Sequence, residues 1–171
     1  MSEMPLEIER KYLIRRPDPA FLADLPDCRV SRIVQTYLLP EGDGFGRRVR
    51  QRSVDGGAWE YTYTRKKRLG AGTHIELEDV IPLETYAALL EEADPEMHPI
   101  EKYRCCIPHA GFLLELDVYA FDSAQATLEI ELPSIDTPVT LPDWVEVIAD
   151  VTERRGFSNF ALAKTLRFPK V

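Results

Sequence analysis

Glu7-Ile8-Glu9-Arg10-Lys11 is the stretch that decides the fold, and residues 12–14 continue it as Tyr-Leu-Ile. Alternate side chains of an extended strand share a face, so the two glutamates and the lysine lie together, opposite Ile8. Carboxylates and an ammonium group in one row can hold a metal ion and a phosphate side by side. Because many solvated strands carry a similar row, the interpretation depends on whether other strands repeat it.

Seven further segments show strand-like alternation, and turn sequences such as Asp55-Gly56-Gly57 separate them. We predict strands over about residues 5–14, 32–39, 46–53, 58–66, 73–81, 101–107, 112–120 and 126–132. We predict helices from Asp18 to near Pro26 and over 83–92, 143–149 and 158–167. Eight short strands joined by hairpin turns predict an antiparallel barrel or sandwich, in a single domain spanning residues 1–171.

Composition excludes several classes of protein. The chain has 29 acidic and 21 basic residues among 171, and its net charge of −8 argues against general nucleic-acid binding. No apolar run is long enough to span a membrane, and acidic residues interrupt any signal-peptide pattern near the N-terminus. Cys28, Cys105 and Cys106 lack metal-ligand spacing. We therefore expect a cytoplasmic protein with reduced thiols and with neither nucleic acid nor membrane as a partner.

Charged residues on the predicted strands segregate by sign. The acids are Glu7, Glu9, Glu60, Glu76, Glu78, Glu115, Asp117, Glu129 and Glu131. The bases are Lys11, Arg48, Arg50, Arg52, Lys66, Lys102 and Arg104. Alternation alone favours a sandwich that turns these charges toward water. That arrangement leaves the clustering of signs unexplained and gives the amphipathic helices no apolar surface to cover.

The alternative is an inverted barrel, with charged faces inward and apolar faces covered by helices. A dry interior is excluded, because each uncompensated buried charge costs several kcal/mol. A water-filled cavity that binds a polyanion with divalent cations avoids this cost. Its bases would hold phosphate oxygens, and its carboxylates would hold Mg²⁺ or Mn²⁺.

The strand motifs resemble the CYTH superfamily, also called triphosphate tunnel metalloenzymes. Glu7-Ile8-Glu9-Arg10-Lys11 is similar to the Glu-x-Glu-x-Lys signature of that family. The resemblance continues through Arg48-Val49-Arg50, Thr64-Arg65-Lys66, Glu76-Leu77-Glu78, Lys102-Tyr103-Arg104, Glu115-Leu116-Asp117, Glu129-Ile130-Glu131, Asp150-Val151-Thr152, Ser158-Asn159 and Leu162-Ala163. It covers nearly the whole chain, and it implies a mainly β member of the α+β class: an eight-stranded antiparallel barrel with a charged interior and a few helices outside.

The resemblance also implies site residues. The triphosphate would be bound by Lys11, Arg48, Arg50, Lys66, Lys102 and Arg104. Metal ligands would come from Glu7, Glu9, Glu78, Asp117, Glu129 and Glu131, and the catalytic set would be Glu7, Glu9, Lys11, Asp117, Glu129 and Glu131. Lys67 directly follows Lys66, so a shift of one residue would exchange which lysine faces inward.

The expected activity is Mg²⁺- or Mn²⁺-dependent hydrolysis of a small triphosphate, with two ions and with inorganic tripolyphosphate as the favoured substrate. The resemblance leaves two enzymatic alternatives, cyclisation of ATP and hydrolysis of thiamine triphosphate. A third alternative is a module that binds polyphosphate or nucleotide without turnover. Family similarity also makes a homodimer one expected oligomeric state.

Overall fold

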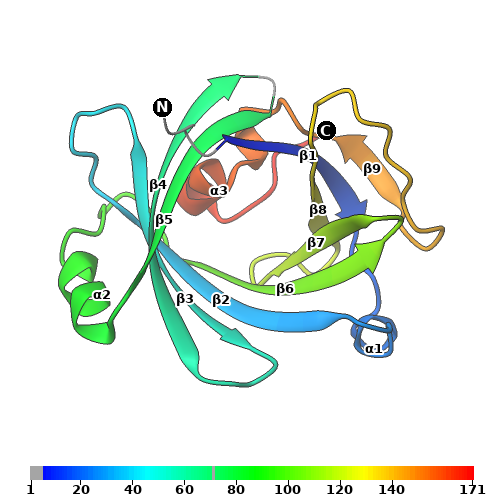
Figure 1. Ribbon diagram of the computed structural model, residues 1–171, viewed down its shortest axis with the longest axis horizontal. Helices are drawn as coiled ribbons and strands as arrows, with labels where there is room; N and C mark the ends of the chain where they lie inside the picture. The colour runs from blue at the N-terminus through cyan, green and yellow to red at the C-terminus, as the bar shows by residue number, and fades with distance from the viewer. Residues whose placement is uncertain (1–5, 71) are drawn as a thin grey trace.

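The computed structural model describes residues 6–70 and 72–171, and over these residues nine strands form one antiparallel sheet. The strands are β1 (Leu6–Arg15), β2 (Arg29–Leu38), β3 (Gly46–Val54), β4 (Trp59–Gly70), β5 (Thr73–Ile81), β6 (Ile100–His109), β7 (Phe112–Tyr119), β8 (Gln125–Glu131) and β9 (Val147–Asp150). Their order is β5-β4-β3-β2-β6-β7-β8-β1-β9, and β5 also pairs with β1. This last pairing closes strands β1 to β8 into a barrel, which confirms the predicted fold class (Figure 1).

The closing strand β1 uses one edge for two partners. Residues Leu6 to Ile8 pair with β5, whereas Tyr12 to Ile14 pair with β9 along the same edge. The opposite edge of β1 pairs with β8 from Glu9 to Arg15. The helix predicted over 143–149 is therefore wrong, because Val147–Asp150 extends the sheet as a strand.

Short helices lie around the barrel in the described part of the chain, at α1 (Pro19–Ala23), α2 (Leu83–Leu90) and α3 (Asn159–Thr165). The Asp18 side chain accepts a hydrogen bond from the amide of Ala20 and caps α1, and Ser158 caps α3 in the same way. These helices confirm three of the four predicted helical segments. None of the helices described is long and apolar enough to cross a membrane.

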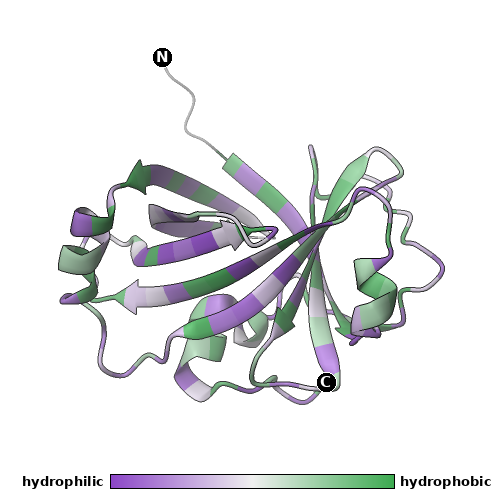
Figure 2. Cartoon of the chain, turned by 90° about the horizontal axis from the view of Figure 1, so that it is seen from below, coloured by the Kyte–Doolittle hydropathy of each residue, from purple (hydrophilic) through white to green (hydrophobic). Residues whose placement is uncertain are grey.

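The main apolar core lies outside the barrel wall. On β7 and β8, Leu114, Leu116, Leu128 and Ile130 are almost fully buried, and they pack outward against α1 and the segment around Trp144. Figure 2 shows the alternation of hydrophilic and hydrophobic residues along the strands that produces the two faces. This arrangement excludes the sandwich alternative, since the apolar faces point outward and the charged faces point inward.

A second apolar cluster closes one end of the barrel. Leu162 and Ala163 of α3 are fully buried against Tyr37 and Tyr119, which project from the inner face. The Tyr119 hydroxyl donates to Asn159 Oδ1 at 2.7 Å. In Figure 1 α3 is seen within the outline of the barrel. The interior is therefore a cavity with α3 as its floor.

Candidate functional site

The barrel interior holds a cavity of about 410 Å³, a size typical of sites for small molecules. Its wall is almost wholly charged. The lining residues are Leu6, Glu7, Gln35, Arg48, Arg50, Arg52, Lys66, Glu76, Glu78, Lys102, Arg104, Glu115, Glu129, Glu131 and Asn159. Alternation brings these side chains together, because each strand turns one of its two faces inward.

Most of the predicted site residues converge on this cavity. Glu9, Lys11 and Asp117 are missing from its lining. Lys11 and Asp117 are buried and Glu9 is half-buried, and all three contact residues that line the cavity or lie beside it. Lys66 lines the cavity, whereas the Lys67 ammonium lies over the Phe45 ring, 5.7 Å from its centroid. The ambiguity between these two lysines is thereby resolved in favour of Lys66.

The bases of β6 form ion pairs with the acids of β7. Lys102 Nζ lies 2.8 Å from Asp117 Oδ2, and Arg104 Nε lies 2.8 Å from Asp117 Oδ1. Arg104 also reaches Glu115 at 2.7 Å. Burial opposes ionisation of Asp117, but Arg104 and Lys102 lower the pKa of this carboxyl to about 2. Both oxygens of Asp117 are thus occupied by the bases they orient.

The arginines of β3 are paired with the acids of β5. Arg48 lies 3.6 Å from Glu76, and Arg50 lies 3.3 Å from Glu78. Burial and the neighbouring Arg48 lower the pKa of Arg50 to about 10. The Nε atoms of both arginines are buried without a hydrogen-bond partner in the described part of the chain. Both guanidinium groups therefore retain donors for an oxygen-rich ligand.

Lys11 connects the acidic side of the cavity to its floor. Its ammonium group lies 3.0 Å from Glu129 and donates to the carbonyl oxygen of Phe157 at 2.8 Å. Burial opposes ionisation of Glu129, but Lys11 and Arg104 lead the bases that hold its pKa well below the usual value. Glu129 is therefore held as a carboxylate at neutral pH.

Acids without a basic partner gather where β1 meets β8. Glu9 and Glu131 are directly opposite each other in the β-ladder, a position that is destabilising for like charges. Within the described residues, Glu7 and Glu131 form no ion pair, and Glu9 approaches only the imidazole of His74, at 3.8 Å. Burial and the neighbouring Glu129 raise the pKa of Glu9 to about 9. Glu9 is therefore mainly protonated near neutral pH, and the formal negative charge of this part of the wall comes from Glu7 and Glu131.

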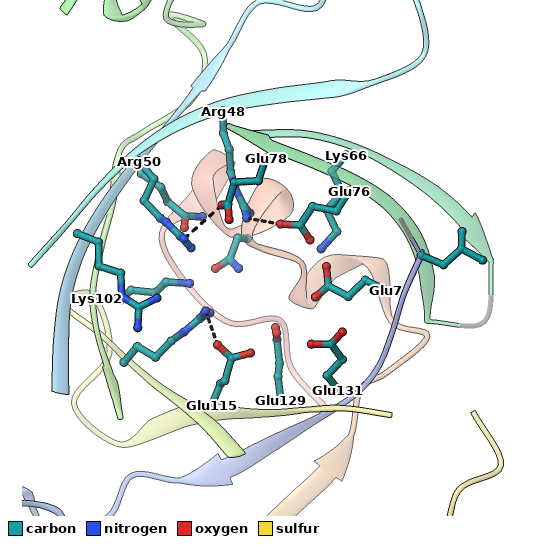
Figure 3. A pocket seen from close by; sticks show the side chains of 15 residues that line it. Glu7, Arg48, Arg50, Lys66, Glu76, Glu78, Lys102, Glu115, Glu129 and Glu131 are labelled. Atoms are coloured by element: carbon teal, nitrogen blue, oxygen red, sulfur yellow. Dashed lines mark hydrogen bonds and ion pairs between the residues drawn. The ribbon is translucent and has the colours of Figure 1, made fainter. Parts of the chain in front are cut away.

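The two sides of the cavity differ in sign. Figure 3 shows Arg50 and Lys102 on one side and Glu7 and Glu131 on the opposite side. No three His, Cys, Asp or Glu residues in the described part of the chain lie close enough together to form a metal site.

The lining residues absent from the predicted phosphate, metal and catalytic sets are Leu6, Gln35, Arg52, Glu76, Glu115 and Asn159. Arg52, Glu76 and Glu115 belong to the predicted charge pattern, whereas Gln35 and Asn159 do not. Gln35 lies on the inner face of β2, and Asn159 begins α3 at the floor. Neither side chain is charged, so neither contributed to the pattern of segregated charges. The one available signal for Gln35 was its position two residues before Tyr37, on the same face of a predicted strand.

The closed barrel, its inverted polarity and its charged cavity are features of the triphosphate tunnel fold, and they support the resemblance of the chain to the CYTH superfamily. Its structure is similar to that of the inorganic triphosphatase NE1496, at 28% identity and a TM-score of 0.59, over 96% of this chain and 98% of that chain. A second structure of NE1496, described as a hypothetical protein, matches at 29% identity and a TM-score of 0.59, over 95% and 99% of the two chains. The PH1819 protein of Pyrococcus horikoshii OT3 shares the fold at 18% identity and a TM-score of 0.54, over 75% and 80% of the two chains. No family model and no curated relative matches the chain.

The perturbed Glu9 carboxyl leads to a prediction about stability. Its pKa rises from the usual 4.5 to about 9 in the folded protein, so between these pH values the folded state binds a proton that the unfolded state has released. Stability therefore falls as the pH rises from about 4.5 to about 9. Glu9→Gln imitates the protonated group and should raise the melting temperature at pH 8.5 by roughly 4–8 °C, which corresponds to about 2 kcal/mol.

Thermal unfolding in chelator at several pH values measures this difference. The gap between variant and wild type should shrink toward pH 4.5. The matched control is Glu101→Gln, at an exposed position on β6, which should show no gap at any pH. A Glu9→Gln variant that is less stable than wild type at pH 8.5 would show that Glu9 is ionised and favourable in the folded protein.

Proposed function

We propose that this protein hydrolyses inorganic tripolyphosphate to diphosphate and phosphate, with Mg²⁺ or Mn²⁺ as cofactor. The observation that carries the proposal is the set of lining bases inside a blind cavity. These bases are Arg48, Arg50, Arg52, Lys66, Lys102 and Arg104. Arginine and lysine bind phosphate oxygens with charge-assisted hydrogen bonds, and converging strands make several such contacts possible at once.

The charge balance of the wall supports the need for a cation. The described lining also contains six acids, which are Glu7, Glu76, Glu78, Glu115, Glu129 and Glu131, against the six bases. The wall is therefore close to neutral, so a bound polyanion leaves excess negative charge in a partly buried site unless cations enter with it. The carboxylates without basic partners have the oxygen donors that Mg²⁺ and Mn²⁺ prefer.

The residues best placed to hold these cations are Glu7, Glu9 and Glu131, together with Glu129, which contacts Lys11 through Oε1 only. Asp117 and Glu78 are less suited to the metal roles expected for them, because Asp117 binds Lys102 and Arg104, while Glu78 accepts from Arg50 and Thr64. We assign these two acids to the positioning of phosphate-binding bases. A bound divalent cation would supply Lewis-acid stabilisation of the charge on the phosphate oxygens.

Besides binding the substrate, the bases position its phosphates for reaction. Phosphoryl transfer requires the attacking and leaving oxygens to lie in line at phosphorus, and positioning with electrostatic stabilisation supplies most of the rate enhancement. The floor formed by α3 limits how far the chain of phosphates enters, and the bases of β3 and β6 hold it from two sides. Burial lowers the pKa of Lys102, but Asp117 at 2.8 Å favours its charged form, so the ion pair keeps Lys102 available as a cation for phosphate.

The choice of an inorganic substrate rests on two observations. NE1496, which is similar over nearly the whole chain, is described as an inorganic triphosphatase. Among the described residues that line the cavity none is aromatic, so the wall has no ring on which a nucleobase or a thiamine ring could stack.

The direct test is phosphate release from tripolyphosphate by the purified protein. We expect release with Mg²⁺ or Mn²⁺, its loss in excess chelator and its return when the cation is restored. ATP and thiamine triphosphate in the same assay test the organic substrates, and chromatography of the ATP products detects cyclic AMP. Tight binding of tripolyphosphate by calorimetry, without turnover at any metal concentration, would instead identify a binding module.

A further inference from the structure

Gln35 is the buried neutral side chain of β2 that lines the charged cavity. Only 1% of its surface is exposed. In the β-ladders it lies opposite Arg50 of β3 on one side and Ile100 of β6 on the other. An amide that is almost completely buried in this position needs partners for both its oxygen and its nitrogen.

The structure supplies one of these partners. Gln35 Nε2 donates to the Tyr37 hydroxyl at 3.3 Å, an interaction within the same strand face. Gln35 Oε1 is buried and accepts no hydrogen bond from any of the described residues. Its cross-strand neighbour Arg50 directs its guanidinium group to Glu78 instead. The contact with Tyr37 therefore orients the amide and leaves its oxygen as an unused acceptor at the cavity wall.

The chemistry of an amide oxygen restricts what can occupy this position. It accepts hydrogen bonds and cannot donate them, and the oxygens of an ionised triphosphate are also acceptors. A phosphate oxygen facing Gln35 Oε1 would leave both atoms without a donor, which is costly in a buried site. A water molecule satisfies both, because it can donate one proton to the amide and the other to phosphate.

We propose that Gln35 positions the water that attacks the terminal phosphorus, an inference that rests on the proposed hydrolysis of tripolyphosphate. The water oxygen forms the new bond to phosphorus, and the bond from that phosphorus to the bridging oxygen breaks. The bridging oxygen keeps the electron pair and leaves as part of diphosphate. Both protons of the water leave with the orthophosphate, so no external acid or base is needed for balance.

Gln35→Met tests this assignment, since it keeps the length of the side chain and removes its hydrogen-bonding atoms. A misplaced nucleophile costs on the order of 100-fold in rate, so kcat should fall by about that factor. KM for tripolyphosphate, and Kd for its non-hydrolysable imido analogue, should stay within about twofold of wild type. Gln35→Glu retains an acceptor oxygen and should recover part of kcat, with a higher KM because its charge repels phosphate.

The matched control is Gln51→Met. Gln51 lies on β3 next to Arg50, on the opposite face, where it pairs with Val34 and Tyr61. The Gln51→Met substitution should leave kcat and KM unchanged. Melting temperatures of all three variants, with and without the analogue, separate misfolding from loss of function.

Failure of the proposed hydrolysis and failure of the role assigned to Gln35 give different results. A wild-type protein without any hydrolysis of tripolyphosphate overturns the proposed function. A wild-type enzyme that hydrolyses tripolyphosphate, combined with a folded Gln35→Met variant of unchanged kcat, overturns only the role of Gln35. A variant with unchanged kcat and a large increase in KM and Kd would show that the amide contacts phosphate directly, which also contradicts the assignment.

Discussion

Glu129→Gln is expected to lower kcat for tripolyphosphate by 10²- to 10³-fold, the usual cost of removing one electrostatic stabiliser from an active site. Glu129 lies between a proposed phosphate-binding base and the carboxylates proposed to hold the cation. It contacts the Lys11 ammonium at 3.0 Å and lines the cavity near the unpartnered acids of β1 and β8. The surrounding bases keep it ionised, so it can meet an incoming cation without first losing a proton.

The glutamine variant removes the charge and preserves the shape of the side chain. Lys11 then loses its charged partner, keeps its hydrogen bond to the Phe157 carbonyl oxygen and can still donate to the amide oxygen at position 129. We therefore expect weaker binding of Mg²⁺ or Mn²⁺, seen as a higher metal concentration for half-maximal activity, together with the fall in kcat. A steady-state titration of the metal at saturating substrate measures both quantities.

Glu101→Gln serves again as the control, since Glu101 lies on the opposite face of β6 and is exposed. Thermal unfolding establishes whether each variant is folded before its activity is measured. Near-wild-type kcat and an unchanged metal requirement in a folded Glu129→Gln variant would remove Glu129 from the site.

The inverted barrel was predictable because the signal is repeated in most strands. A single row such as Glu7, Glu9 and Lys11 suits a solvated surface equally well. Clustering of one sign on each of several strands distinguishes a binding cavity from a surface selected for solubility, where signs are mixed. The same alternation determines which lysine of the pair at 66 and 67 points inward, once the register of β4 with β3 and β5 is known.

What the sequence could not predict depends on contacts between distant segments. β9 has four residues, too few for a period of two to be distinguished from a helical turn, and it forms because β1 has a free edge beyond Ile8. The opposition of Glu9 and Glu131 is a property of register across more than one hundred residues of sequence. Asn159 reaches the cavity only because α3 packs against Tyr37 and Tyr119.

Asp117→Asn is expected to destabilise the protein by about 3–5 kcal/mol, the usual cost of removing one partner from a buried ion pair. Only 1% of the Asp117 side chain is exposed, as is 1% of that of Lys102. The carboxylate compensates two bases at once, Lys102 and Arg104. The neutral amide leaves two positive groups close together in the wall, with Glu115 as the remaining acid that contacts Arg104.

The loss should appear in thermal unfolding as a decrease of roughly 6–20 °C in melting temperature at pH 7, for a domain of this size. The sign of the pH dependence follows from the lowered pKa of Asp117. The wild-type contribution is present above about pH 4, where the unfolded carboxyl ionises, and is lost as the pH falls toward about 2. The gap between variant and wild type should therefore shrink in acid. Asp79→Asn, at an exposed position on β5, is the matched control and should show little change.

Adding tripolyphosphate distinguishes two possible roles of Asp117, which are orientation of the phosphate-binding bases and ligation of the metal. If this residue orients Lys102 and Arg104 toward phosphate, the ligand supplies the missing negative charge in the variant. The melting temperature of Asp117→Asn should then rise more on addition of tripolyphosphate without metal than that of wild type, since the anion binds to bases that are already unpaired. If Asp117 instead ligated the metal, the variant would lose stabilisation by Mg²⁺ and tripolyphosphate together and gain nothing from the anion alone.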